Sequence, residues 1–350
     1  MSSLASTATA PAMKVGQTLA GARWDYRLTE PLEEDVHQST VFKAEVLPRD
    51  GVIGPAKWAV IKTVPPDNEA ARESLKREYN AYRISSIASN PYFRAMYDII
   101  SDPKNPGEDA GDSPPCLALE WMDCTLAQVS SECHLRNYIL IKAIMDAALF
   151  SLVTLDKEKL VNTDIKPDNI LLSNVDTDHP IVKVGDLGLL HLDGFCHPAQ
   201  PFAMRAPEVY QGLGCVHRSQ IWALAATLFC WIKPGVFGTA GNKMPLCRPS
   251  WCIAKLMRLF PGWTGPPIEN GVRRCEFELS KALIEESVPE ILKVSSLEDE
   301  MQTMGMPPEL RDLFRRLLVV DPGDRPSASE VLASEEYLAL KKKALTSTVG

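Results

Sequence analysis

The sequence predicts an α+β fold in which a small β-rich N-terminal part carries one main helix and a larger C-terminal part is mostly helical. Runs of extended-type residues occupy 25–46, 58–64, 93–100 and 116–121. Beyond them, apolar residues recur at helical spacing. With 45% apolar and 23% charged residues among 350, the chain can bury a sizeable core.

Residues 1–24 contain no acidic residue and are rich in serine, threonine and alanine, which predicts a disordered tail. A mitochondrial transit peptide is the alternative, because such peptides are also poor in acidic residues. We expect a first lobe over 25–120, a second over 121–342 and a short final tail over 343–350.

In the first lobe, the strand at 58–64 carries Lys62 and the next segment, 68–85, has helical spacing. The prolines, glycines and aspartates of 102–115 predict a loop between the last two strands.

In the second lobe, the apolar run over 138–155 is interrupted by Lys142 and Asp146, so it predicts a buried helix, over 135–155, and not a membrane span. The segment 219–231 is apolar almost all round, which is typical of a helix in the middle of a core. Helices over 310–320 and 327–340 complete the predicted lobe.

Four polar residues lie close together in sequence after the first of these helices. Val161-Asn-Thr-Asp-Ile-Lys-Pro-Asp-Asn-Ile-Leu-Leu172 places Asp164, Lys166 and Asn169 in one short loop, and Asp186 follows 22 residues after Asp164. Phosphoryl transfer needs an acceptor for a hydroxyl proton, a cation near the moving group and oxygen ligands for magnesium. These residue types supply all three.

Here the chain resembles the eukaryotic protein kinase family, whose catalytic loop reads H-R-D-x-K-x-x-N and whose metal loop reads D-F-G. Ala59-Val-Ile-Lys62 is similar to the lysine strand of the small lobe, and Arg205-Ala-Pro-Glu208 to the end of an activation segment. The resemblance implies a bilobal fold. Thr163-Asp-Ile-Lys166, Asp186-Leu-Gly188 and Arg205 are most similar to the SR-protein kinase branch.

The resemblance implies ATP and Mg²⁺ as cofactors and assigns nucleotide contacts in the first lobe. Lys62 would orient the phosphates and pair with Glu78, sixteen residues further along; Glu73 is the alternative partner. Val41 would follow the phosphate loop, and Glu120 and Met122 would form the hinge beside the base.

The resemblance also assigns the remaining roles. Asp164 would deprotonate the acceptor hydroxyl, Lys166 would neutralise the γ-phosphoryl group, and Asn169 and Asp186 would bind magnesium. An arginine placed like Arg325 pairs, in the family, with the glutamate placed like Glu208.

The glycine-rich phosphate loop departs from the family pattern. Aligned on Val41, its three glycine positions fall on Glu34, Val36 and Ser39. Glycines let backbone N–H groups approach phosphates closely. The nucleotide is therefore held mainly by Lys62, the metals and the hinge, or it binds weakly.

Asn162-Thr163 replaces the family's His-Arg pair, whose arginine clamps a phosphorylated residue in the activation segment. No Ser, Thr or Tyr lies between Asp186 and Glu208. Both observations predict that phosphorylation of this segment does not switch activity.

Two further positions depart from the family pattern. Pro201 stands where serine/threonine kinases usually have a threonine, and Gln220 stands where they have an aspartate that accepts N–H groups of the catalytic loop. An amide oxygen can still accept, but more weakly than a carboxylate. We expect a slightly looser catalytic loop.

Three functions compete: an active serine/threonine protein kinase, a pseudokinase that acts as a binding or scaffold protein, and a small-molecule phosphotransferase. The third is disfavoured because Arg205-Ala-Pro-Glu208 and Arg325 shape the protein-substrate side of a kinase. We expect a protein substrate. The segment 276–301 carries eight acidic residues and two lysines, so it predicts a solvated face, or alternatively a docking site for basic or arginine-rich substrates.

The net charge of −8 argues against a nucleic-acid ligand, and no apolar run predicts a membrane partner. Nine cysteines without a C-x-x-C pair indicate a reducing compartment. We expect a cytoplasmic or nuclear protein, with mitochondria as the alternative.

Overall fold

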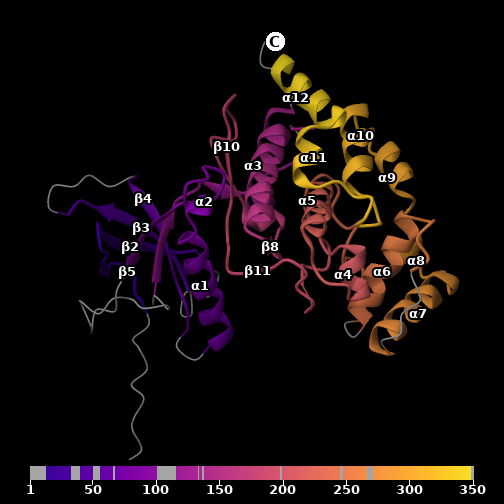
Figure 1. The fold of residues 1–350 in the computed structure, drawn as a ribbon, viewed down its shortest axis with the longest axis horizontal. Coiled ribbons are helices and arrows are strands. Elements are labelled where there is room, and N and C mark those ends of the chain that lie inside the picture. The colour runs from indigo at the N-terminus through magenta and orange to yellow at the C-terminus, as the bar shows by residue number, and fades with distance from the viewer. Residues whose placement is uncertain are drawn as a thin grey trace, which may run out of the picture. The chain divides into compact units, whose positions relative to one another are not determined.

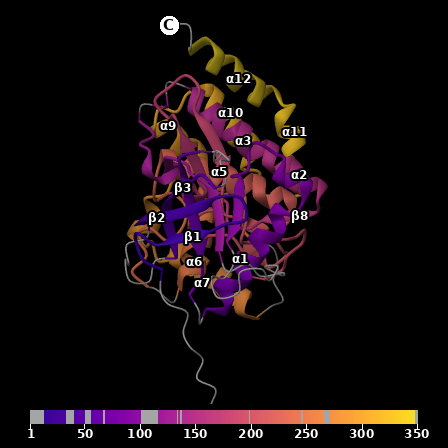
Figure 2. The ribbon, with the colours of Figure 1, turned by 90° about the vertical axis from the view of Figure 1, so that its left-hand side faces the viewer.

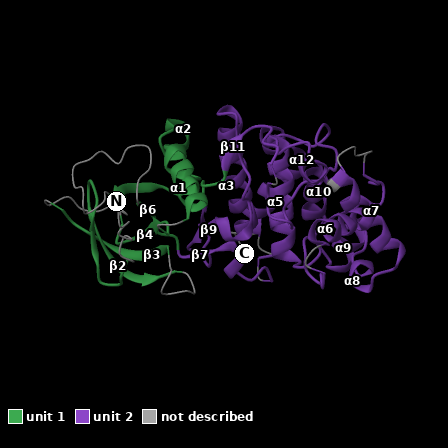
Figure 3. Ribbon diagram, turned by 90° about the horizontal axis from the view of Figure 1, so that it is seen from below, with its two compact units in different colours: residues 1–122, 186–189 green, residues 123–185, 190–350 purple. Residues whose placement is uncertain are grey.

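The structure is a computed structural model that describes residues 13–32, 40–49, 56–65, 68–100, 116–132, 134–135, 138–197, 199–244, 247–265 and 271–347. They form two compact units, shown in different colours in Figure 3. Unit 1 comprises the chain as far as Met122 together with Asp186–Leu189, and unit 2 comprises Asp123–Gly185 and Leu190–Gly350. Unit 1 is rich in strands and unit 2 is mostly helical, which confirms the predicted fold class (Figure 1).

Unit 1 is built on a six-stranded antiparallel sheet with the order β1-β2-β3-β4-β6-β5. Its strands are β1 (Thr18–Ala20), β2 (Asp25–Pro31), β3 (Val41–Leu47), β4 (Trp58–Thr63), β5 (Met96–Ile100) and β6 (Cys116–Glu120). Side chains along β3 alternate between buried and half-buried, the period of a strand with one face on a core.

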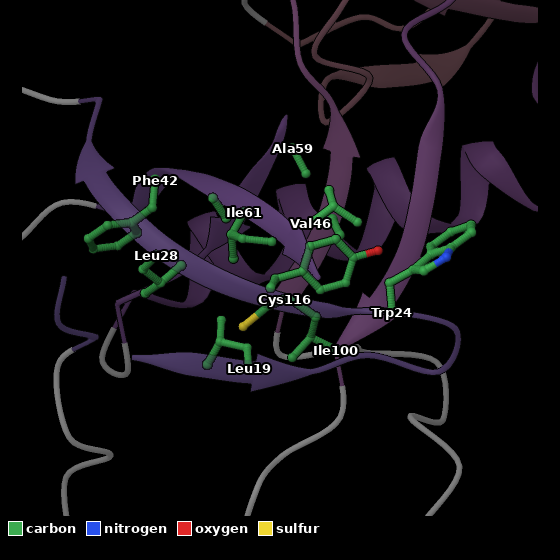
Figure 4. Packing of buried hydrophobic residues seen from close by; sticks show 12 residues of the cluster. Leu19, Trp24, Leu28, Phe42, Val46, Ala59, Ile61, Ile100 and Cys116 are labelled. Atoms are coloured by element: carbon green, nitrogen blue, oxygen red, sulfur yellow. The ribbon is translucent and has the colours of Figure 1, made fainter. Parts of the chain in front are cut away.

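The core of unit 1 includes residues that the sequence placed in a disordered tail. Leu19 and Trp24 are buried with Leu28 and Phe42 in one apolar cluster (Figure 4). The buried carboxylate of Asp98 accepts a hydrogen bond from the backbone N–H of Arg23 at 2.8 Å, which fixes the turn after β1. The prediction of a tail over 1–24 is therefore wrong for residues 18–24.

Helix α1 (Glu69–Tyr82) begins where the sequence predicts it, because the Asn68 side chain accepts the backbone N–H of Ala71 at 2.9 Å as an N-cap. A second short helix, α2 (Ser85–Ala88), follows directly. The buried side of α1 carries Glu78 as well as Leu75 and Tyr79.

Unit 2 begins with short elements. Its strands are β7 (Cys124–Thr125), β8 (Leu160–Asn162), β9 (Ile170–Ser173), β10 (Ile181–Val184) and β11 (Leu190–Leu192), and its 3₁₀ turns are η1 (Leu126–Gln128) and η2 (Pro167–Asn169). β10, β9 and β7 form one small sheet, and β11 pairs with β8 in another. The turns and strands around η2 hold the segment that carries Asp164.

The helices of unit 2 are α3 (Tyr138–Lys157), α4 (Pro207–Gln211), α5 (His217–Ile232), α6 (Arg248–Leu259), α7 (Gly271–Glu285), α8 (Pro289–Leu292), α9 (Leu297–Thr303), α10 (Pro308–Leu317), α11 (Ala328–Leu332) and α12 (Glu335–Ser347). α5 is buried along almost its whole length, as predicted. α3, α10, α11 and α12 pack together (Figure 1 and Figure 2).

Helix α3 is the one helix in the described part of the chain that is long and apolar enough to cross a membrane by length and composition, but 67% of its apolar window is buried within the protein. Its two interrupting charges are satisfied locally: Lys142 pairs with Asp146 at 2.5 Å, and Asp146 also accepts the hydroxyl of Tyr337 from α12. The prediction of a buried helix is confirmed.

The helix predicted over 327–340 is in fact two helices. α11 begins at a capping box formed by Ser327 and Glu330, and α12 begins where the Ser334 hydroxyl accepts the N–H of Tyr337 at 3.2 Å. α12 continues to Ser347, so the stretch predicted as a tail from residue 343 is helical up to residue 347.

The acidic stretch 276–301 covers most of α7, then α8 and α9, and it is not a uniform solvated face. Glu300 is buried and pairs with Lys233. Three more of its eight acidic residues, Glu278, Glu290 and Glu298, are paired with basic residues of the chain itself.

Candidate active site

In unit 1, the side chains of β4 and α1 form a charged cluster. Lys62 Nζ lies 2.7 Å from Glu78 Oε2 and 2.9 Å from Asp186 Oδ1. Glu78 is fully buried, whereas Glu73, the alternative partner, is exposed on the same helix. Because residues one helical turn apart share a face, burial of Leu75 and Tyr79 brings Glu78 toward the sheet.

Two carboxylates act on the ammonium group of Lys62. Burial alone would lower the pKa of Lys62, but the carboxylates of Glu78 and Asp186 outweigh it, so the pKa is raised above its ordinary value. Two carboxylates around one ammonium leave a net charge of −1, which favours the approach of a divalent cation.

Asp186 belongs to unit 1, although the sequence placed it in the second lobe, because its neighbours are tied to α1. Leu187 N–H points at Glu78 Oε1 at 3.4 Å, and Arg77 Nε donates to Gly188 O at 2.9 Å. A Cβ at Gly188 would lie 2.2 Å from the Ser74 hydroxyl oxygen and 3.2 Å from the Ser74 backbone oxygen, so a larger residue there would displace the Ser74 side chain.

The other predicted nucleotide-binding residues of unit 1 lie around this cluster. Val41 begins β3 and lies opposite Lys62 in the β3–β4 register. Glu120 ends β6, where its backbone carbonyl accepts Arg94 Nε at 2.7 Å, and a carbonyl can accept two hydrogen bonds. Met122 is buried just after it. The predicted glycine positions at residues 34, 36 and 39 lie outside the described residues.

In unit 2, the turn after β8 carries the predicted proton acceptor. Asp164 is buried, with 7% of its surface exposed, and its Oδ2 accepts Lys166 Nζ at 2.9 Å. Asn169 Nδ2 donates to both the backbone oxygen and Oδ2 of Asp164, at 2.8 Å each. Lys166 and Asn169 therefore orient this carboxylate.

Each unit carries one predicted magnesium ligand that offers an oxygen atom. Both amide hydrogens of Asn169 are directed at Asp164, so Oδ1 is the atom that it offers as a ligand. The Asp186 carboxylate is 38% exposed and carries anionic oxygen, the ligand type that Mg²⁺ prefers. Asn169 would supply a neutral oxygen and Asp186 a charged one.

The catalytic loop is anchored by two amide side chains, of which the sequence predicted only one. Asn162, which replaces the family's histidine, accepts the backbone N–H of Asp164 on its Oδ1 at 2.9 Å. Gln220, from α5, accepts the N–H of Asn162 on Oε1 at 2.7 Å. The prediction that Gln220 can act as an acceptor is confirmed. The role of Asn162 was missed, although asparagine commonly bonds the backbone two residues on, as here.

The segment 199–206 is held in one conformation by its own side chains. Gln200 is buried in the left-handed region at φ 65°, and its amide bridges Ser219 O at 3.0 Å and Ala206 N at 2.9 Å. Arg205 donates to Gln200 O, and the Tyr210 hydroxyl donates to Phe202 O at 2.7 Å. No phosphate is needed for any of these contacts.

A buried ion pair fixes the helix that follows this segment. Arg325 Nη1 and Nη2 donate to Glu208 Oε1 and Oε2 at 2.7 and 2.9 Å, and the Arg325 side chain is fully buried. Ser219 Oγ adds a bond to Glu208 Oε1 at 2.6 Å. The pairing that the sequence predicts for Arg325 and Glu208 is present.

Comparisons with known proteins agree with this geometry. The family model described as "Protein kinase domain" matches residues 55–337. The stress-activated protein kinase JNK of Drosophila melanogaster is 23% identical over 275 residues, 74% of this chain and 68% of that protein. The serine/threonine-protein kinase atg1 of Dictyostelium discoideum is 33% identical over 176 residues, 46% of this chain and 24% of that protein.

Proposed function

The chain belongs to the protein kinase domain family, and on this premise we propose that it is an ATP-dependent serine/threonine protein kinase. The observation that carries the proposal is the complete polar set, oriented within each unit by hydrogen bonds and ion pairs. Its members are Lys62, Glu78 and Asp186 in unit 1, and Asp164, Lys166 and Asn169 in unit 2. A chain freed from catalysis has no chemical reason to keep all six.

In unit 1, Lys62 orients the α and β phosphates of ATP, and Glu78 holds the ammonium in place. Two residues would hold magnesium, Asp186 from unit 1 and Asn169 from unit 2. When bound, Mg²⁺ neutralises charge on the phosphate oxygens. Glu78 and Asp186 raise the pKa of Lys62 above its ordinary value despite burial, so the lysine would meet the phosphates as a cation.

In unit 2, Asp164 orients the hydroxyl of a serine or threonine substrate and takes its proton as the hydroxyl oxygen bonds to the γ-phosphorus. The bond from that phosphorus to the β–γ bridging oxygen breaks, and ADP leaves. Lys166 neutralises the transferred group while its ammonium stays beside Asp164 Oδ2. Asn169 keeps the Asp164 carboxylate in one orientation.

We further propose that phosphorylation of the segment between Asp186 and Glu208 does not control activity. The segment has no Ser, Thr or Tyr, and contacts of Gln200, Arg205 and Tyr210 support an ordered conformation without a phosphate. Treatment of the purified protein with a broad phosphatase should therefore leave its transfer rate unchanged, and a loss of rate would contradict this part of the proposal.

The second candidate function is a pseudokinase that binds partners with little transfer. Pro201 favours it, because proline has no hydroxyl to bridge Asp164 and Lys166, and so does the glycine-free phosphate loop of the sequence. Basic substrates and the SR-protein kinase branch remain proposals. Pairing of Glu278, Glu290, Glu298 and Glu300 within the chain reduces the charge left for a basic peptide.

The deciding experiment is transfer of labelled γ-phosphate from magnesium ATP to a mixed protein substrate. Asp164→Asn should lower the rate by about 10³-fold, the scale of a lost general base, and Lys62→Met should remove it. Asp168→Asn is the matched control for Asp164→Asn, and Lys57→Met is the matched control for Lys62→Met. Both control residues are exposed and lie four or five positions from the residue that they match in the sequence. Wild-type protein that binds ATP but shows no transfer would favour the pseudokinase.

A further inference from the structure

His217 lies at the first position of α5, three residues before Gln220. Its ring lies between two carboxylates and Gln220, the side chain that binds the catalytic loop. Gln220 Nε2 lies 3.5 Å from His217 Nδ1. On the other side of the ring, Nε2 lies 3.2 Å from Asp156 Oδ1 and 3.6 Å from Asp193 Oδ1. All four side chains belong to unit 2.

The orientation of the Gln220 amide decides which proton His217 can carry. The backbone N–H of Asn162 is a donor, so Gln220 must present Oε1 to it, as the 2.7 Å contact requires. The amide NH₂ then faces His217 Nδ1. A donor needs an acceptor opposite it, so Nδ1 must be unprotonated and the ring proton must lie on Nε2.

Two carboxylates are the charged groups nearest to Nε2, and this buried atom makes no hydrogen bond among the described residues. Asp156 comes from α3 and Asp193 from the turn after β11, and Asp193 also accepts the backbone N–H of His217 at 3.1 Å. On α5 itself, the guanidinium of Arg218 is directed to the backbone oxygens of Gly323 and Arg325. The two carboxylates thus face the Nε2 side, and the amide faces the Nδ1 side.

We propose that His217 is a positioning residue for the catalytic loop, and that protonating its Nδ1 releases the loop. An imidazolium presents N–H groups on both sides, so Nδ1–H would face the NH₂ of Gln220. The amide must then turn, which places NH₂ against the N–H of Asn162 and leaves that donor unpaired in a buried place. Asn162 Oδ1 in turn holds the N–H of Asp164, so the proposed base is loosened.

The role in phosphoryl transfer rests on the proposed kinase function, but the test does not. The probe is hydrogen exchange of the Asn162 amide, followed by NMR on the full chain without nucleotide and corrected for the intrinsic pH dependence of exchange. On acidification from pH 8 to pH 5.5 the protection of this amide should fall about tenfold, which corresponds to the loss of one hydrogen bond.

Two variants test whether His217 causes the fall in protection of the Asn162 amide. His217→Asn supplies an acceptor near the Nδ1 position without a titratable ring, so protection should stay high and independent of pH. Gln220→Glu presents acceptors on both sides, so protonated His217 would donate to it and protection should no longer fall on acidification. His179→Asn, at an exposed histidine, is the matched control and should keep the wild-type fall.

Wild-type protection that does not change with pH, or that falls equally in His217→Asn, would overturn the inference. A pH-dependent amide in a chain that transfers no phosphate would instead overturn only the kinase function. If transfer occurs, its kcat should fall on acidification in wild type and not in His217→Asn. The KM for ATP should stay constant, because Lys62 and its partners are untouched.

Discussion

Lys62 and Asp164 are held by two different kinds of chemistry. Lys62 is fixed by two carboxylates within 3 Å. The backbone of the Asp164 loop is instead fixed by the neutral amides of Asn162 and Gln220, and the Asp164 carboxylate itself is bound by the Asn169 amide and by Lys166. Opposite charges attract over several ångströms and tolerate small displacements. An amide has a donor side and an acceptor side, so it holds its partner only in one orientation.

Between these two sets of contacts, the departures from the family pattern lie among the amides and not in the charged cluster. The charged cluster keeps the family's residues unchanged, while the loop has exchanged a histidine for Asn162 and an aspartate for Gln220. Each replacement still accepts a backbone N–H. The exchange has a structural cost: Asn162 Nδ2 is buried and has no hydrogen-bond partner in the structure.

The largest effect is expected from breaking the charged cluster. Glu78→Ala leaves Lys62 without its fully buried partner, and loss of one member of a buried pair costs about 3–5 kcal/mol of unfolding free energy. Urea denaturation measures the change, with Glu73→Ala as the exposed control on the same helix. A loss below about 1 kcal/mol, the worth of a surface pair, would contradict the contrast between the two chemistries.

A smaller effect is expected from the amide network. Gln220→Leu keeps the volume of the side chain but leaves the N–H of Asn162 buried without an acceptor, which costs about 1–3 kcal/mol. Gln302→Leu, at an exposed position of α9, is the control for the same exchange. If Gln220→Leu destabilised the chain as strongly as Glu78→Ala, neutral and charged anchors would be equivalent here.

The sequence predicts the residues of both chemistries but only part of their contacts. The pairing of Lys62 with Glu78 was implied by the family resemblance, and the buried α5 follows from its apolar composition. β1 escaped prediction because three residues are too short to show a period, and the turn after it is bound by Asp98, more than 70 residues away. The links from Gln200 to Ser219 and from Gln220 to His217 depend on side-chain orientation, which no motif encodes.

The smallest effect is expected at Gln200, where the side chain stabilises the segment through two hydrogen bonds and the backbone conformation destabilises it. Its φ of 65° disfavours any residue with a Cβ, by about 1–2 kcal/mol. Both Gln200→Ala and Gln200→Gly lose the bonds to Ser219 and Ala206, but glycine also removes the backbone strain. Gln200→Gly should therefore be more stable than Gln200→Ala by about 1 kcal/mol. The midpoint of urea unfolding measures the difference, and equal midpoints would mean that the side chain alone fixes this segment.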